Sequence, residues 1–164
     1  MPIDKLLAFF AVVTLASPAL AQPGELRGHV DSRMADTVRT ALDAGVRDFT
    51  INSSDGGYVM FAYLIGGRLK REGASLTING RCLSACALLA FGVPDRRIAP
   101  GADVEIHGAW DQRNPADPTP ARAAAAYMLA NGVPPDLAEG RGTGINAHRL
   151  SPLELSRSGF VATP

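Results

Sequence analysis

The stretch I-N-S-S-D-G-G, residues 51–57, joins a strand-like segment to a helix-like one, and the rest of the fold follows from it. Polar and apolar side chains alternate over residues 48–52, which predicts a strand. The Ser-Ser-Asp-Gly-Gly part has the composition of a turn. Residues 58–72 then have a helical pattern that ends near Lys70, Arg71 and Glu72. The stretch is therefore predicted to be a strand–turn–helix unit.

The same alternation of strand and helix patterns runs from residue 26 to residue 107. Helix 32–44 is indicated by Met34, Val38 and Leu42, which recur every four residues. The other predicted elements are strands 26–31, 75–79 and 103–107 and helix 84–91. Such an order predicts an α/β domain of β-β-α and βαβ units, with mostly parallel strands joined by right-handed crossovers. Beyond it we expect a proline-rich loop 111–120, a helix 121–131, a loop 132–144 and a last helix at 150–154.

Ligand sites in such sheets lie at the carboxyl ends of the strands, where the loops gather. Three turns occupy this position: residues 53–57, residues 80–84, and the segment from His107 onward. Every residue considered below for chemistry lies in or beside one of these turns, or follows them in the chain.

The N-terminus predicts export. Lys5 precedes an apolar stretch over residues 6–16, and a small-x-small sequence ends at Ala21. These are the parts of a secretory signal, and the apolar run is too short to span a bilayer. We therefore expect a signal peptide at residues 1–21, a single domain at residues 22–164, and a periplasmic or secreted product. An uncleaved anchor is the alternative.

The overall charge excludes some partners. The chain has 164 residues, and its 16 Lys and Arg balance its 16 Asp and Glu. A nucleic-acid binder would show a surplus of basic residues. A chain without net positive charge is also not attracted to an anionic membrane surface. We expect no nucleic-acid partner and no membrane attachment after cleavage of the signal.

Cys82 and Cys86 are expected to form a disulfide in an oxidising compartment. The bridge is comfortable if Cys82 lies just before helix 84–91 and Cys86 in its first turn. The two cysteines with His107 and His148 are also zinc-ligand types. However, the cysteine spacing departs from the usual C-x₂-C, so we expect no metal and no cofactor. Whether the bridge regulates Ser84 through its redox state is left open by the sequence.

Four segments together resemble the Clp protease proteolytic subunit family. Residues 51–57 are similar to its I-N-S-P-G-G turn, and residues 82–86 (C-L-S-A-C) lie where it carries its nucleophilic serine. Residues 106–108 (I-H-G) resemble its catalytic I-H-Q segment. Residues 149–154 and 158–161 look like its F-L-S-x-x-E-A…Y-G-L-I ending. The resemblance implies the ClpP/crotonase-like fold, and it is nearest to secreted relatives whose serine lies between two cysteines.

The resemblance places Ser84 as a nucleophile and His107 as its general base. Neutral imidazole is suited to activating a hydroxyl near pH 7. The backbone N–H groups of Ala85 and Gly57 would then form an oxyanion hole. The structural alternative is that Ser84 only caps a helix and His107 only ends a strand.

The third member of a triad is where the sequence departs from the family. No carboxylate occurs in residues 145–149, and Asn146 is the candidate left to orient His107. Glu105 and Asp111 are substitutes that the sequence leaves open. Replacing the aspartate of a serine triad by asparagine lowers turnover by about 10⁴. The sequence therefore predicts a weak or specialised serine hydrolase or peptidase.

A catalytically inactive ClpP-like module that binds a periplasmic peptide or ligand is the alternative. In either case the expected partner is a peptide or small envelope ligand. The segment after His107 is shorter than the helix that joins the rings of Clp peptidases, which predicts no double ring and no ATPase partner. A small homo-oligomer is left open.

Overall fold

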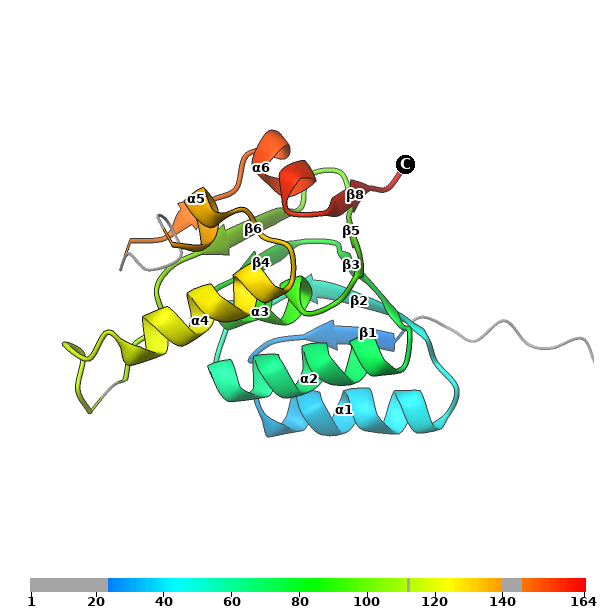
Figure 1. Cartoon of the computed structure of the whole chain (residues 1–164). Coiled ribbons are helices and arrows are strands. Elements are labelled where there is room, and N and C mark those ends of the chain that lie inside the picture. Colours follow the sequence, from blue (N-terminus) through cyan, green and yellow to red (C-terminus); the bar gives the residue numbers. More distant parts are fainter. Residues whose placement is uncertain (1–23, 112, 140–145) are drawn as a thin grey trace, which may run out of the picture.

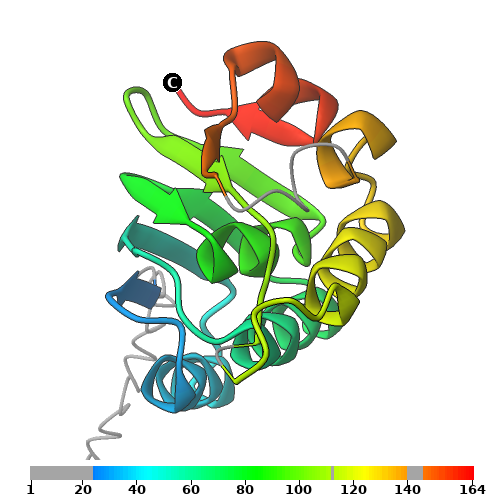
Figure 2. The ribbon, with the colours of Figure 1, turned by 90° about the vertical axis from the view of Figure 1, so that its left-hand side faces the viewer.

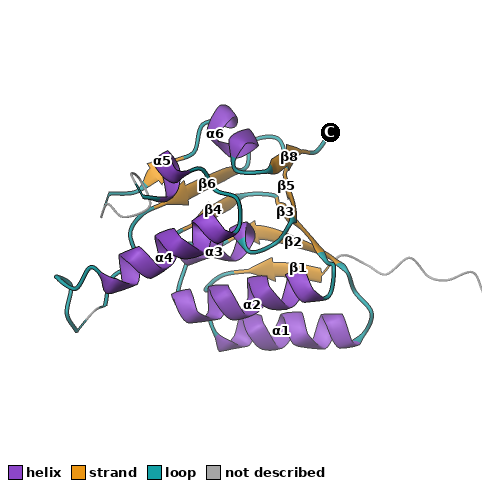
Figure 3. Cartoon of the chain, in the orientation of Figure 1, coloured by secondary structure: helices purple, strands orange, loops and turns teal. Residues whose placement is uncertain are grey.

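The computed structural model describes residues 24–111, 113–139 and 146–164 (Figure 1). The predicted signal peptide, residues 1–21, lies outside the described residues. So does the last part of the predicted loop 132–144, residues 140–144. Figure 3 shows helices and strands alternating through the first half of the chain. In chain order the elements are β1 (Gly24–Arg27), α1 (Ser32–Asp43), β2 (Asp48–Ser53), α2 (Val59–Arg71), β3 (Ser75–Ile78), β4 (Arg81–Leu83), α3 (Ala85–Phe91), β5 (Asp95–Ile98), β6 (Asp103–Ile106), α4 (Thr119–Ala130), α5 (Pro135–Ala138), β7 (His148–Arg149), α6 (Pro152–Arg157) and β8 (Phe160–Ala162).

The strands form two sheets. The larger has the order β1-β2-β3-β5-β8, and all of its neighbouring strands are parallel. The smaller has the order β4-β6-β7, in which β4 and β6 are parallel and β6 and β7 are antiparallel. The predicted α/β class with mostly parallel strands is therefore confirmed. The two sheets meet where residues 54 and 82 form an isolated parallel bridge.

Some of the predicted elements differ from the observed ones. The first strand was expected at residues 26–31 but is observed at Gly24–Arg27, since the chain turns at Gly28 with a φ of +83°. The pattern did not indicate the short or charged strands β4, β5, β7 and β8, nor the single turn α5 within the predicted loop 132–144. These short strands complete the two sheets.

Helix α3 lies at the centre of the molecule. All seven of its residues are buried, and it contacts α2 and α4 on one side and strands of the smaller sheet on another (Figure 2). Such a helix must be short and built of small and apolar residues, because no face of it meets water. Helix α1, by contrast, buries one face through Met34, Val38 and Leu42, as its periodicity predicts. Within the described residues, no helix has the length and apolar character needed to cross a bilayer.

Arg96 lies in β5 and is the most unusual residue of the core, since it is only 6% exposed. Its guanidinium donates hydrogen bonds to four backbone carbonyls, at 2.6 Å to Phe91, 3.3 Å to Val93, 2.9 Å to Asn131 and 2.7 Å to Ser158. Phe91, Asn131 and Ser158 stand at the C-terminal ends of α3, α4 and α6, where helices carry partial negative charge. Burial lowers the pKa of this guanidinium from its ordinary value. One cation thus holds three helix ends together.

Candidate functional site

The turn after β2 is pressed between two other segments. On one side, Ser54 N–H donates to Arg81 O and Leu83 N–H donates to Ser54 O, which joins the turn to β4. On the other side, Val30 N–H donates to Gly56 O and Tyr58 N–H donates to Val30 O. The turn is therefore fixed by backbone hydrogen bonds at both edges.

Two glycines make this close packing possible. A Cβ on Gly56 would lie 2.7 Å from the Cβ of Ser84 and 3.3 Å from the Ala85 nitrogen. A Cβ on Gly57 would lie 2.5 Å from Val30 O. Both residues also have positive φ, +96° and +151°. The turn thus brings its backbone against the segment that carries Ser84, which only glycine permits.

Ser84 joins β4 to α3 in a strained conformation. Its φ is +61° and its ψ is −119°, and it is the only non-glycine residue with positive φ in the described part of the chain. A conformation this rare costs on the order of 1–3 kcal/mol and is found mainly at functional sites. The Ser84 side chain caps no helical N–H and makes no hydrogen bond to any described residue. No hydrogen bond of the side chain therefore compensates for the strain among the described residues.

His107 follows β6, the strand that pairs with β4. Leu83 is in register with Glu105, and Ser84 N–H donates to Glu105 O at 2.9 Å, so Ser84 and His107 leave neighbouring strands at the same end. Between the Ser84 hydroxyl and the His107 ring there is no hydrogen bond in this structure. Such bonds are often long in the absence of substrate, so the geometry is compatible with a pair that closes on binding.

The ring of His107 is held by its own loop. Its Nδ1 lies 2.9 Å from Gly108 O. Because a carbonyl can only accept, Nδ1 carries a proton, and in the neutral form of the ring Nε2 is the nitrogen with the lone pair. The ring also packs against Trp110, with centroids 4.9 Å apart and an interplanar angle of 31°. The ring of His107 is therefore held by its own loop, through Gly108 and Trp110, and not by a carboxylate.

Two backbone N–H groups near Ser84 have no backbone acceptor among the described residues, although Ala85 itself is 0% exposed. Ala85 is the first residue of α3, so its N–H has no acceptor within the helix. The N–H of Gly57 takes part in no backbone hydrogen bond with the described residues. The Gly57 N–H lies in the turn after β2 and the Ala85 N–H in the segment that carries Ser84. These two segments are in contact at Gly56, as the predicted oxyanion hole requires.

The three candidates for the third triad position have other surroundings. Asn146 is exposed and makes no hydrogen bond to His107. The Glu105 carboxylate lies 3.5 Å from the Arg149 guanidinium and 3.8 Å from that of Arg81. The Asp111 carboxylate accepts from Arg113 N–H at 2.8 Å. In this structure none of the three orients His107.

Cys82 and Cys86 form the predicted disulfide. Cys82 lies in β4 and Cys86 in the first turn of α3, which is the placement that the sequence analysis required. Both residues are 0% exposed. His148 is in register with Ile106 in the smaller sheet, and its Nε2 lies 3.0 Å from Glu154 Oε1. No group of three or more metal-ligand side chains occurs among the described residues.

Two open hollows lie near this end of the sheets. The first, of about 330 Å³, begins directly after His107 and is lined by Gly108, Ala109, Trp110, Pro115, Ala116, Asp117, Pro118, Ala121 and Arg122. Its walls are mostly apolar. It is therefore suited to an apolar side chain of a ligand that reaches the histidine.

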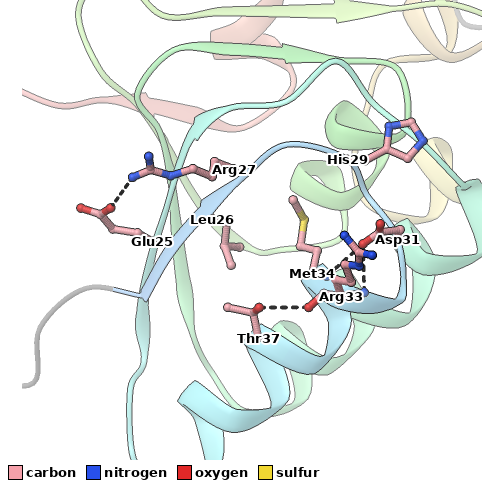
Figure 4. A pocket seen from close by; sticks show the side chains of 8 residues that line it. All are labelled: Glu25, Leu26, Arg27, His29, Asp31, Arg33, Met34 and Thr37. Atoms are coloured by element: carbon pink, nitrogen blue, oxygen red, sulfur yellow. Dashed lines mark hydrogen bonds and ion pairs between the residues drawn. The ribbon is translucent and has the colours of Figure 1, made fainter.

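The second hollow, of about 320 Å³, lies between β1 and α1 (Figure 4). Its charged side chains are used within the fold: Glu25 pairs with Arg27 at 2.9 Å, and Asp31 accepts from two N–H groups of the first turn of α1. It contains none of the residues predicted for chemistry. We therefore place the candidate site at Ser84 and not here.

Sequence reasoning missed three contributors to the site. Gly56, although quoted in the turn, was not recognised as the residue that contacts Ser84. The adjacent pair of glycines was the available signal, since one glycine is enough for an ordinary turn. The roles of Gly108 O and Trp110 had no signal, because they depend on how the loop after β6 folds back on its own histidine.

Comparison with known proteins finds likeness in structure and not in sequence. No family model and no curated protein matches the chain. Among solved structures, a serine-to-alanine mutant of the membrane-bound stomatin-specific protease 1510-N is 18% identical, with a TM-score of 0.65 over 84% of this chain and 76% of that one. A lysine-to-alanine mutant of the same protease, in complex with a substrate peptide, is 19% identical, with a TM-score of 0.63 over 84% and 72%.

ClpP1 from Listeria monocytogenes is similar over a still larger share of its length. It is 14% identical, with a TM-score of 0.64 over 85% of this chain and 91% of that one. Identities this low establish the arrangement of the elements and leave the chemistry open. The resemblance seen in the four sequence segments is thus confirmed at the level of architecture: the chain has the ClpP-like fold.

Proposed function

We propose that this chain is a secreted serine hydrolase of the peptidase type, with Ser84 as nucleophile and His107 as general base. The observation that carries the proposal is the backbone of Ser84. The residue is held at a φ of +61° in a sharp strand-to-helix turn, and its hydroxyl makes no hydrogen bond to a described residue. Nucleophilic serines of hydrolases are presented on such strained strand-to-helix turns, because the turn exposes the hydroxyl.

The proposed reaction uses groups that already have suitable surroundings. Ser84 Oγ attacks a carbonyl carbon and its proton passes to His107 Nε2. The N–H groups of Ala85 and Gly57 donate to the oxyanion. The imidazolium then protonates the leaving amine or alcohol, and water, activated by the same imidazole, hydrolyses the acyl-enzyme.

The missing third residue makes the proposed activity weak. Gly108 O orients the imidazole but carries no full negative charge, so it stabilises the imidazolium less than an aspartate would. Trp110 compensates in part, because a cation above an indole face gains about 0.5–2 kcal/mol. Asn146 would contribute only if its segment moved toward His107 on binding.

The proposed substrate is a peptide or a small envelope ligand with an apolar group. The hollow formed by the loop after His107 has mostly apolar walls, and Trp110, which packs on the His107 ring, is one of them. The peptidase names of the similar structures favour an acyl-transfer reaction over other chemistry of the fold. The buried disulfide favours an oxidising compartment, in agreement with a signal peptide at residues 1–21.

Labelling of the purified, oxidised protein with a fluorophosphonate tests this proposal. We expect one adduct, located on Ser84 by mass spectrometry, that is absent from Ser84→Ala. In His107→Ala the labelling rate should fall at least 10²-fold, which is the lower end of the contribution of a general base. Ser151→Ala is the matched control, because Ser151 is also a serine at a helix start but its hydroxyl is used in a capping box. It should label as the wild type does.

The second candidate function is a ligand-binding module without catalysis. It is favoured by the absence of a carboxylate hydrogen-bonded to His107 among the described residues. A folded, oxidised protein that forms no adduct on Ser84 would support this function and contradict the first.

A further inference from the structure

We infer that the Cys82–Cys86 disulfide is a positioning device that holds Ser84 in its strained conformation. The inference rests on the proposed function of Ser84 as a nucleophile. The bridge joins β4 to the first turn of α3, with a Cα–Cα distance of 5.2 Å, and Ser84 is the middle residue of the loop that it closes.

Both ends of this loop are anchored. Cys82 is in register with Val104 of β6, and Cys86 lies in the fully buried helix α3. Rotation of Ser84 toward an ordinary negative φ would change the angle between β4 and α3. With the bridge intact, such a change must displace one of the two anchors, so the strain cannot relax locally.

Hydrogen bonds alone restrain the segment unevenly. On the strand side, Leu83 N–H donates to Ser54 O and Ser84 N–H donates to Glu105 O. On the helix side, Leu88 N–H donates to Ser84 O at 3.2 Å, whereas the N–H of Ala85 has no acceptor in the helix, as its proposed role requires. The disulfide therefore provides the covalent restraint on the side where the proposed oxyanion donor has to stay unpaired.

The burial of the bridge indicates a permanent restraint and not a redox switch. Thiol–disulfide exchange needs a thiolate to reach one of the two sulfurs. Cys82 and Cys86 are both 0% exposed, so reduction requires the protein to open first. The wild-type bridge should consequently resist a small thiol under native conditions and be reduced only at the rate of unfolding.

The test compares the wild type with a bridge-less Cys82→Ala/Cys86→Ala protein. We expect the rate constant for fluorophosphonate labelling of Ser84 to fall at least tenfold in the bridge-less protein. Val38→Ala is the control for a general loss of stability. Val38 is buried in α1, and it belongs to none of the segments that carry the candidate site. It should label at the wild-type rate. An unchanged rate in the bridge-less protein would overturn the inference.

A second measurement does not depend on catalysis. Ser84→Gly removes the Cβ that makes positive φ costly. If the bridge maintains the strain, this substitution raises the denaturant midpoint of the oxidised protein and leaves that of the bridge-less protein nearly unchanged. An equal rise in both proteins would show that packing alone holds Ser84, and would overturn the inference even if the wild type forms no adduct.

The two failures are therefore distinguishable. A wild type that does not label contradicts the proposed function, while the midpoints still decide whether the bridge positions Ser84. Because removal of two buried sulfurs can impair folding, Cys82→Ala/Cys86→Val, which restores part of the lost volume, is measured in parallel by both methods.

Discussion

Ser84 and Arg96 are both held in energetically costly states, and they differ in how the cost is offset. Arg96 is a buried cation, and its guanidinium finds four carbonyl acceptors and packs between Phe91 and Phe160. Ser84 is a strained backbone position whose side chain finds no partner among the described residues. The cost at Arg96 is offset by contacts of the same residue, whereas the cost at Ser84 is not.

This difference separates structure from function. A buried polar group that is fully hydrogen-bonded contributes to the stability and uniqueness of the core. A strained residue with an unused hydroxyl contributes nothing to stability, so its conformation needs another reason. The comparison predicts that changes at Arg96 destabilise the protein, while the right change at Ser84 stabilises it.

The largest effect is expected for Arg96→Met. The substitution keeps an apolar stem between the aromatic rings but leaves four buried carbonyls without their donor. We expect a loss of about 3–5 kcal/mol in the free energy of unfolding, typical for disruption of a buried charged network. The measurement is urea unfolding followed by circular dichroism.

Arg97→Met is the matched control for this prediction. Arg97 is the next residue of β5, but its guanidinium is exposed and pairs only with Asp95 at 2.7 Å. The loss there should stay within about 1 kcal/mol. Equal losses of stability at the two positions would show that the hydrogen bonds of Arg96 do not hold the three helix ends together.

A smaller effect of opposite sign is expected for Ser84→Gly in the oxidised protein. Relief of about 1–3 kcal/mol of strain exceeds the roughly 0.5–1 kcal/mol that glycine costs through chain entropy, so a net gain of about 1 kcal/mol should follow. Ser84→Ala keeps the Cβ and should change stability little. Both variants should fail to label. A destabilised Ser84→Gly protein would remove the contrast with Arg96.

The smallest effect concerns α6, the helix that brings Ser158 O to Arg96. Hydrogen bonds from Ser151 N–H and its hydroxyl, followed by the contact with His148, lower the pKa of Glu154 to about 2. The folded-state pKa lies below the unfolded one, so this stabilisation is present above about pH 4.5 and is lost as the pH falls through about 2.

Glu154→Gln tests this pH dependence. At pH 7 the substitution should cost about 1 kcal/mol, the usual value of a helix cap, and the difference from the wild type should shrink toward pH 2. Glu25→Gln, which changes an exposed pair with Arg27, serves as control. A difference that is constant over this pH range would contradict the capping role of the carboxylate.

How much the sequence predicts depends on how local the signal is. Most of the strands and helices up to residue 107 were predictable, with β4 and β5 as exceptions, because buried faces such as that of α1 repeat with a regular period. Strand β5 was not, since its sequence D-R-R-I looks exposed while Arg96 points into the core. A buried arginine is recognisable only when its distant acceptors are known.

The candidate site also has parts with a local sequence signal and parts without one. The positions of Ser84, Ala85 and Gly57 followed from three turns at the carboxyl ends of parallel strands. The way in which His107 is held did not follow, because sequence reasoning searched for a side chain and the structure uses the carbonyl of Gly108. Because every residue has a backbone carbonyl, the sequence does not indicate which carbonyl will accept a hydrogen bond from a given side chain.

The contacts of Arg96 also have a consequence for the order of events during synthesis. Its acceptors at Asn131 and Ser158 lie 35 and 62 residues downstream. While the ribosome has not yet released residues 131–160, the guanidinium lacks half of its carbonyls, and β5 lacks its neighbour β8. Burial of Arg96 at that stage would be costly. A chain that ends before residue 160 should thus keep β5 open, and closure should come as one cooperative step, which pulse proteolysis of purified chains truncated at increasing lengths would detect.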